Sequence, residues 1–262
     1  MSIKSIFLKL KYVFTPTIAG FYSGHNYLKR SKIAKLKSKI GSDESLCTQI
    51  FEEKFAQIVG LGNAVSFASG RMGFFVLMKV LGIGSGDEVV LCGSTCSVMP
   101  NAILRVGAKP VYSDIDKDTF GSCARSIEAC ITPNTKLVVA QHSFGIPCEI
   151  DVIAKLCKEN GVFLVEDCAL ALGSRLREKC VGTFGDAAIF STDHSKPINT
   201  IIGGLVYSEN SDITKELKAI QKKCRHLPET KEKALWTQFL VERYLAKPWL
   251  YGTLVFYNSL LG

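Results

Sequence analysis

The chain has 262 residues, of which 47% are hydrophobic and 22 are glycine, so it is long enough to bury a large core and is typical of an α/β protein with many turns. Its net charge of +8 is uneven, because residues 1–40 hold nine Lys or Arg and no acid while the remainder is nearly neutral. A neutral folded body argues against an enzyme that acts on nucleic acids, which needs a basic surface.

The ten cysteines are scattered singly, with no C-x-x-C pair and no histidine at metal-binding spacing. We therefore expect free thiols, no bound metal and a reducing, cytoplasmic compartment. No uninterrupted apolar run reaches the ~20 residues of a membrane span. Lys9 and Lys11 interrupt the first apolar stretch, which argues against a signal peptide.

Residues 1–41 are expected to form a basic extension that contains a short amphipathic helix ending at Pro16. Its apolar face carries Ile3, Ile6, Phe7, Leu10 and Phe14. Two interpretations are equally open. The helix contacts the anionic inner face of a membrane as a peripheral element, or it packs on its own domain or on a second subunit.

From residue 42 onward, apolar patterns predict alternating strands and helices. Helices are expected at 51–59, 70–81, 98–106, 122–131 and 150–160, and strands at 64–67, 88–92, 110–113, 136–140, 162–165, 187–190 and 205–207. This order, with short connections, predicts a mainly parallel sheet covered by helices on both faces. Ligands of such sheets bind at the carboxyl ends of the strands.

Three features lie at the ends of predicted elements. Ser69-Gly70-Arg71 joins a strand to a helix N-terminus, whose free N–H groups suit a phosphate. Glu166-Asp167 follows a buried strand, where an acid holds a cationic ring nitrogen or simply caps the next helix. Lys196 lies between two buried strands; its neutral amine would attack a carbonyl and form a Schiff base, although a lone lysine there more often extends to water.

A phosphate cradle, a carboxylate and a lysine together are what pyridoxal phosphate requires. In this interpretation Lys196 binds the cofactor covalently and Asp167 keeps the pyridine nitrogen protonated. The backbone at Gly70 and the hydroxyl of Ser191, five residues before the lysine, hold the phosphate.

The chain resembles the DegT/StrS-type nucleotide-sugar aminotransferases, a fold-type-I family that depends on pyridoxal phosphate, from about Phe51 to Tyr207. The resemblance rests on ordered segments: 81–89 (LGIGSGDEV), 101–103 (NAI), 106–111 (VGAKPV), 114–116 (DID), 142–145 (HSFG), 166–169 (EDCA), 182–186 (GTFGD), 190–196 (FSTDHSK) and Gly203-Gly204. It implies a cofactor-binding large domain over 42–210. It also implies Lys196 as the catalytic residue, Asp167 as the partner of the ring nitrogen, and Gly70, Arg71 and Ser191 at the phosphate.

Three positions depart from the family pattern. Cys96 stands where an aromatic ring often stacks on the cofactor, so the thiol is expected to cover the ring with less area. Leu170 replaces a Gln or His, and Ile202 replaces a Glu. The resemblance implies transfer of an amino group from an amino-acid donor, such as glutamate, to a keto group on a nucleotide-linked sugar, by a homodimer that serves surface glycan synthesis. The departures leave open a non-catalytic homologue or a sugar-modifying lyase.

Residues 211–262 are expected to form a helical, apolar extension, with helices at 213–223 and 235–245 and an apolar stretch at 249–261. Complete members of the resembled family continue into a smaller C-terminal domain. We therefore expect the chain to be truncated relative to them. The alternative is a naturally short enzyme whose tail docks on its own large domain, on a second subunit or on a membrane.

Overall fold

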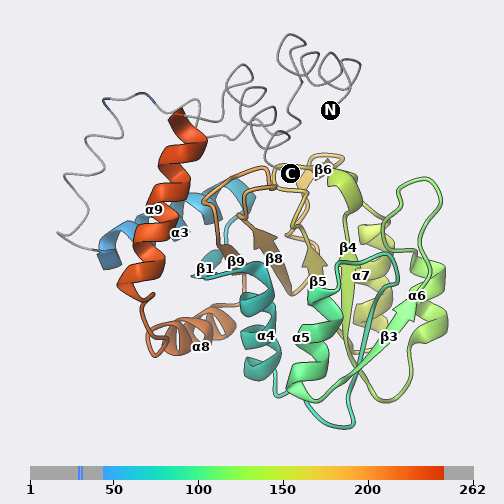
Figure 1. The fold of residues 1–262 in the computed structure, drawn as a ribbon. Helices are drawn as coiled ribbons and strands as arrows, with labels where there is room; N and C mark the ends of the chain where they lie inside the picture. Colours follow the sequence, from blue (N-terminus) through green and yellow to red (C-terminus); the bar gives the residue numbers. More distant parts are fainter. Residues whose placement is uncertain (1–28, 30, 32–43, 245–262) are drawn as a thin grey trace, which may run out of the picture. The chain divides into compact units, whose positions relative to one another are not determined.

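The computed structural model describes residues 29, 31 and 44–244 (Figure 1). The amphipathic helix expected before Pro16 and the apolar stretch expected at 249–261 lie outside these residues. A compact unit, Ile40–Arg225, holds the sheet and its helices. Helix α9 (Glu229–Tyr244) belongs to a second unit and is amphipathic only weakly, with no buried residue.

The compact unit contains a sheet of seven strands in the order β1-β9-β8-β5-β4-β2-β3. The strands are β1 (Asn63–Phe67), β2 (Glu88–Cys92), β3 (Lys109–Ser113), β4 (Thr135–Gln141), β5 (Phe163–Asp167), β8 (Ala187–Ser191) and β9 (Gly204–Ser208). Strand β9 pairs antiparallel with both neighbours, and the other pairs are parallel. The prediction of a mainly parallel sheet is therefore confirmed, with β9 as the one reversed strand.

Helices cover both faces of this sheet, as the sequence predicts (Figure 1). They are α3 (Glu44–Val59), α4 (Gly70–Val80), α5 (Val98–Val106), α6 (Ala124–Cys130), α7 (Ile150–Glu159) and α8 (Ser211–Gln221). Successive strand residues point to opposite faces. Val89 and Leu91 accordingly pack with α4, α5 and α8, whereas Val90 packs with α6 and α7.

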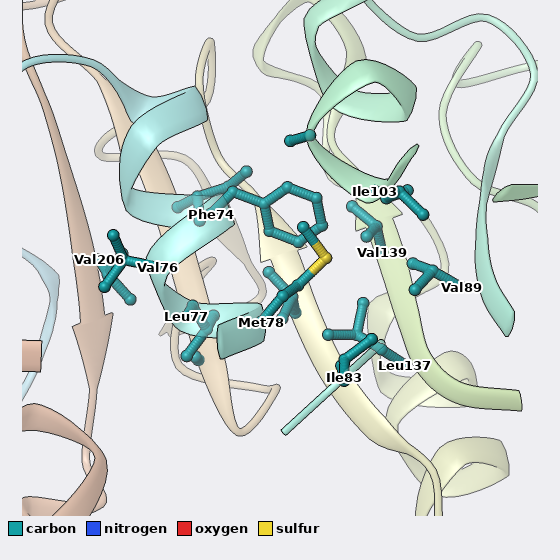
Figure 2. Close-up of a cluster of buried hydrophobic side chains, with 14 of the residues drawn as sticks. Phe74, Val76, Leu77, Met78, Ile83, Val89, Ile103, Leu137, Val139 and Val206 are labelled. Atoms are coloured by element: carbon teal, nitrogen blue, oxygen red, sulfur yellow. The ribbon is translucent and has the colours of Figure 1, made fainter. Parts of the chain in front are cut away.

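The face under α4 and α5 carries the larger core. Phe74 and Met78 extend from α4 and lie among Ile103 of α5 and the strand residues Leu137 and Val139 (Figure 2). All five are fully buried. The packed interface fixes α4 and α5 side by side on the sheet, with both of their N-termini at the carboxyl edge of the strands.

Some features were not expected from the sequence. A two-stranded ribbon, β6 (Arg175–Leu176) and β7 (Lys179–Cys180), and a short 3₁₀ turn, η2 (Ser143–Gly145), are too short to give a periodic pattern. Helix α8 belongs to the compact unit, where Leu217 is fully buried. The domain boundaries expected from the sequence stay a prediction. No helix in the described part of the chain is long and apolar enough to cross a membrane.

Candidate active site

The carboxyl ends of six strands meet at one edge of the sheet, because only β9 runs the other way. The turn from β1 to α4 brings Gly70 and Arg71 to this edge, and the loop after β2 brings Cys96. Asp167 and Ser191 are the last residues of β5 and β8, which are adjacent strands. The sheet topology therefore gathers residues that are far apart in the sequence.

Every residue that the sequence analysis assigned to the cofactor lines one cavity of about 250 Å³. These residues are Gly70, Arg71, Cys96, Asp167, Ser191 and Lys196. A second cavity of about 190 Å³ adjoins it and shares Cys96, Asp167 and Lys196. The structure thus brings the predicted set together, and the role of each residue stays a prediction.

The N-terminus of helix α4 lies at the cavity and is capped by Ser69. Ser69 is extended (φ −165°), and its Oγ accepts a hydrogen bond from the Met72 N–H at 3.2 Å. The other N–H groups of the first turn have no intrahelical acceptor and carry the positive end of the helix dipole. The Arg71 side chain is exposed and forms no ion pair within the described residues. The end of α4 is therefore suited to an anion.

Two glycines allow α4 to approach the sheet closely at this point. A Cβ on Gly204, the first residue of β9, would overlap the backbone of Gly70. A Cβ on Gly70 would lie 3.0 Å from the carbonyl oxygen of Phe190. Side chains at either position would push the helix N-terminus away from β8 and β9. The Gly203-Gly204 motif is thus explained by close backbone packing.

Asp167 is a buried carboxylate, with 8% of its surface exposed at the cavity. Its Oδ1 accepts one hydrogen bond, from the Ala169 N–H at 3.0 Å, and its other oxygen has no partner among the described residues. Burial raises the pKa of Asp167 above its ordinary value, although the Ala169 N–H and electrostatic interactions with His142 and Lys196 oppose that rise. A cation placed in the cavity would favour the charged carboxylate.

Lys196 lies in the loop between β8 and β9 and is half-buried, as expected for a lysine between two buried strands. Its backbone N–H donates to the Asp193 carbonyl at 2.9 Å, which closes a turn. The loop is tied to β8 because the Thr200 N–H donates to the Thr192 carbonyl at 2.8 Å and the two hydroxyls lie 2.6 Å apart. The lysine therefore belongs to a loop held in place by hydrogen bonds, and it lines both cavities.

A buried anchor holds the end of β5, and the sequence analysis missed it. Glu166 is fully buried and accepts three backbone hydrogen bonds, from Gly182, Phe184 and Gly185, at 2.6 to 2.7 Å. Its Oε2 also lies 3.1 Å from Nε2 of His142. Since the Cys148 N–H donates to Nδ1 of that histidine, the proton sits on Nε2 and is donated to Glu166. Asp167, the next residue, is fixed by this network.

The anchor also explains a grouping that resembles a metal site. His142, Glu166 and Cys168 are all buried and place potential ligand atoms within 4.8 Å of one another. Both nitrogens of His142 and both oxygens of Glu166 are already engaged in hydrogen bonds. Burial raises the pKa of the Cys168 thiol well above its ordinary value, so the thiolate that metals prefer is disfavoured. This grouping is a structural network.

Cys96 and Leu170, two of the three residues that depart from the family pattern, line the cavities. Leu170 lines the 190 Å³ cavity and is 39% exposed, so it contributes an apolar wall where a polar contact was expected. Ile202 is also partly exposed. His194 is exposed and pairs with Asp193.

The arrangement fits pyridoxal phosphate. An amine and a buried carboxylate face one cavity, and the N-terminus of α4 with Arg71 closes one side of it. Among the described residues, one oxygen of that carboxylate has no hydrogen-bond partner and Arg71 forms no ion pair. Val98, Met99 and Ile189 add apolar walls that suit a planar ring.

Comparisons with known proteins show which family the chain resembles. Residues 34–241 match the model of the DegT/DnrJ/EryC1/StrS aminotransferase family. The chain is 35% identical over 172 residues to the spore coat polysaccharide biosynthesis protein SpsC of Bacillus subtilis, which covers 66% of this chain and 44% of SpsC. It is 36% identical over 178 residues to GDP-perosamine synthase of Escherichia coli O157:H7, which covers 68% of this chain and 47% of that enzyme.

A solved structure of DesI with its TDP-sugar product superposes with a TM-score of 0.69 at 30% identity, covering 76% of this chain and 52% of DesI. The chain thus spans about half the length of the relatives that it matches. The matched region contains the whole sheet and every predicted site residue. From sequence, fold and site together, the chain belongs to the DegT/DnrJ/EryC1/StrS aminotransferase family.

Proposed function

We propose that this chain is a pyridoxal-phosphate-dependent aminotransferase that moves an amino group to a keto group of a nucleotide-linked sugar. The observation that carries the proposal is the single cavity in which the Lys196 amine, the Asp167 carboxylate and the N-terminus of α4 meet. The family to which the chain belongs uses pyridoxal phosphate. The substrate class is supported by the relatives named as GDP-perosamine synthase and by DesI, which was solved with a TDP-sugar product.

Each site residue has a role that its surroundings support. When bound, pyridoxal phosphate supplies an aldehyde that reacts with amines and a ring that takes up electrons from the substrate. Lys196 Nζ would hold that aldehyde in the resting enzyme and, once released from it, would accept and return the proton at the substrate Cα. The second oxygen of Asp167, which has no partner among the described residues, would accept the ring N–H. The first turn of α4, Arg71 and Ser191 would hold the phosphate, and Cys96 would cover the ring, since all of them line the same cavity.

The experiment uses the chain as it is, loaded with pyridoxal phosphate and mixed with glutamate in a single turnover. The proposal predicts one equivalent of the corresponding keto acid per bound cofactor. Lys196→Arg is the matched control, because it keeps the positive charge and removes the nucleophilic amine. The proposal fails if the loaded wild-type chain forms no keto acid, which would favour a homologue that binds the cofactor without turnover.

The oligomeric state, the cellular location and the biological role of the chain are also proposals. We infer a homodimer and a cytoplasmic location, with residues 42–210 as the cofactor-binding domain, from family membership and from ten cysteines that form no disulfide within the described residues. A role in surface polysaccharide synthesis is supported by the name of SpsC. Peripheral membrane contact by the helix predicted before Pro16 is supported by the basic charge of residues 1–40 and by the apolar pattern of its sequence. Liposome co-sedimentation with and without residues 1–16 tests that contact.

A further inference from the structure

A further cavity of about 780 Å³ lies where the strands begin, at the edge of the sheet opposite to the candidate active site. It is lined by Lys136 and Phe163, at the start of β4 and β5, and by Asp186, directly before β8. The second half of α7 forms the other wall, so we call this cavity the α7 groove. It shares no residue with the cavities that contain Lys196, and the roles proposed for the site residues do not account for it.

Positive charge predominates around the α7 groove. Asp186 is the one acid that lines it, against three lysines, Lys136, Lys155 and Lys158. Lys136 and Lys158 form no ion pair among the described residues. Lys155 lies 3.8 Å from Glu159, but both side chains are mostly exposed, so this pair is weak. The groove therefore keeps uncompensated positive charge, which favours an anion.

The floor of the α7 groove is apolar. Val162 and Leu164 are buried there, and Phe163 and Phe184 are half-buried. The ammonium group of Lys179 lies 4.4 Å from the centre of the Phe184 ring, which adds a fourth cation beside the groove. The volume falls within the range of small-molecule sites, about 300–1,000 Å³. An apolar floor with a cationic rim suits an anion that is joined to an apolar body.

One wall of the α7 groove is hydrogen-bonded to the buried anchor of the candidate active site. Phe184 and Gly185 both line the groove, and their N–H groups donate to Oε1 of Glu166 at 2.6 and 2.7 Å. Asp167, the next residue, lines the cavity that contains Lys196. A single carboxylate therefore connects the groove wall to the active-site strand end. A molecule that binds against Phe184 would restrict the loop that holds Glu166.

We propose that the α7 groove binds a small phosphate monoester with an apolar body, and that the bound molecule steadies the 182–185 loop on Glu166. Lys136 and Lys158 contact the phosphate, and Phe184 contacts the apolar body. A phosphate monoester carries about two negative charges near pH 7, which match two ammonium groups better than the single charge of a carboxylate does. This site does not rest on the proposed function, and inorganic phosphate alone is the competing ligand.

The experiment measures binding of phenyl phosphate and of inorganic phosphate to the full chain by calorimetry, after saturation with pyridoxal phosphate and removal of the excess. The double variant Lys136→Gln, Lys158→Gln is expected to bind phenyl phosphate about tenfold more weakly, because two favourable charge contacts are lost. The matched control is Lys54→Gln, Lys79→Gln, which removes the same charge from exposed positions of α3 and α4 outside the groove. Neither double variant alters the N-terminus of α4, so any binding of the probe there is equal in both.

Two further measurements test the apolar contact and the connection to Glu166. Phe184→Leu is expected to weaken binding of phenyl phosphate severalfold and to leave inorganic phosphate unchanged, because an aromatic contact is lost while the backbone hydrogen bond stays. Hydrogen exchange of the 182–185 amides is expected to slow severalfold when phenyl phosphate is bound to the wild-type chain, and to stay unchanged in the double variant Lys136→Gln, Lys158→Gln.

Two results would overturn the site: no saturable binding of phenyl phosphate by the wild-type chain, or equal affinity in wild type and in the double variant Lys136→Gln, Lys158→Gln. Equal effects of Phe184→Leu on both probes would refute the contact with an apolar body. Saturable binding without slower exchange at 182–185 would refute the connection to Glu166. Cofactor attachment is measured separately, and its failure while lysine-dependent binding persists would contradict the proposed function but not this site.

Discussion

Replacing Asp167 by asparagine tests whether this carboxylate binds the cofactor or only stabilises the fold. The side chains are nearly the same size, and the asparagine oxygen can keep the 3.0 Å hydrogen bond from the Ala169 N–H. The asparagine NH₂ group replaces the second carboxylate oxygen, which has no partner among the described residues. The cofactor-free protein therefore loses no hydrogen bond. Because burial raises the pKa of Asp167, the charged carboxylate destabilises the empty folded state.

The pH dependence has a definite sign. A folded-state pKa above the ordinary value of 3.8 means that the folded chain holds its proton more tightly than the unfolded chain does. The unfolding free energy of the empty wild-type chain therefore falls as pH rises from about 3.8 through the raised folded-state value, and this term is absent from Asp167→Asn. At neutral pH the empty variant is expected to be as stable as wild type or more stable.

Cofactor binding is expected to change in the opposite direction. The loss of a charge-assisted hydrogen bond to the ring nitrogen costs about 1.5–3 kcal/mol, which weakens the affinity for pyridoxal phosphate roughly ten- to a hundredfold. Urea unfolding of the empty chain and equilibrium dialysis of the cofactor measure the two effects. Asp114→Asn is the control, because Asp114 follows β3 at the same edge and also accepts one backbone hydrogen bond. A destabilised empty variant with unchanged cofactor affinity would refute the reasoning and make Asp167 a structural acid.

Three further predictions test the framework of the site. Glu166→Gln turns an amide toward buried N–H donors and is expected to lower the unfolding free energy by about 3 kcal/mol; an unchanged urea midpoint would contradict the buried anchor. Gly204→Ala is expected to lower the unfolding free energy by at least about 2 kcal/mol and to weaken cofactor binding. Gly84→Ala serves as the tolerated control, because its added Cβ would meet only a carbonyl oxygen at 3.7 Å. Bound pyridoxal phosphate is expected to protect Cys96 from iodoacetamide but not the exposed Cys47, and equal labelling of Cys96 with and without cofactor would place the ring elsewhere.

The sequence predicted the elements well because their signals are local. Buried parallel strands such as β2 contain continuous apolar runs, here residues 89–92, and the helices between them are patterned, so the alternating order and the sheet type followed. The gathering of Gly70, Asp167 and Lys196 in one cavity also followed, since carboxyl ends of parallel strands share an edge.

What the sequence did not reveal depends on contacts between distant segments. Glu166 looked like one of two adjacent acids, and only the fold shows that three amides of the 182–185 loop and His142 enclose it. The reversal of β9 has no pattern of its own, because a buried antiparallel strand is as apolar as a parallel one.

The central claim is that Lys196 carries the cofactor, and covalent mapping tests it most directly. The chain is saturated with pyridoxal phosphate, reduced with borohydride and digested, and the modified peptide is located by mass spectrometry. The account predicts a pyridoxyl group on Lys196, at close to one per chain, and its loss in Lys196→Arg. A label on a different lysine, or no label in the saturated protein, would contradict it.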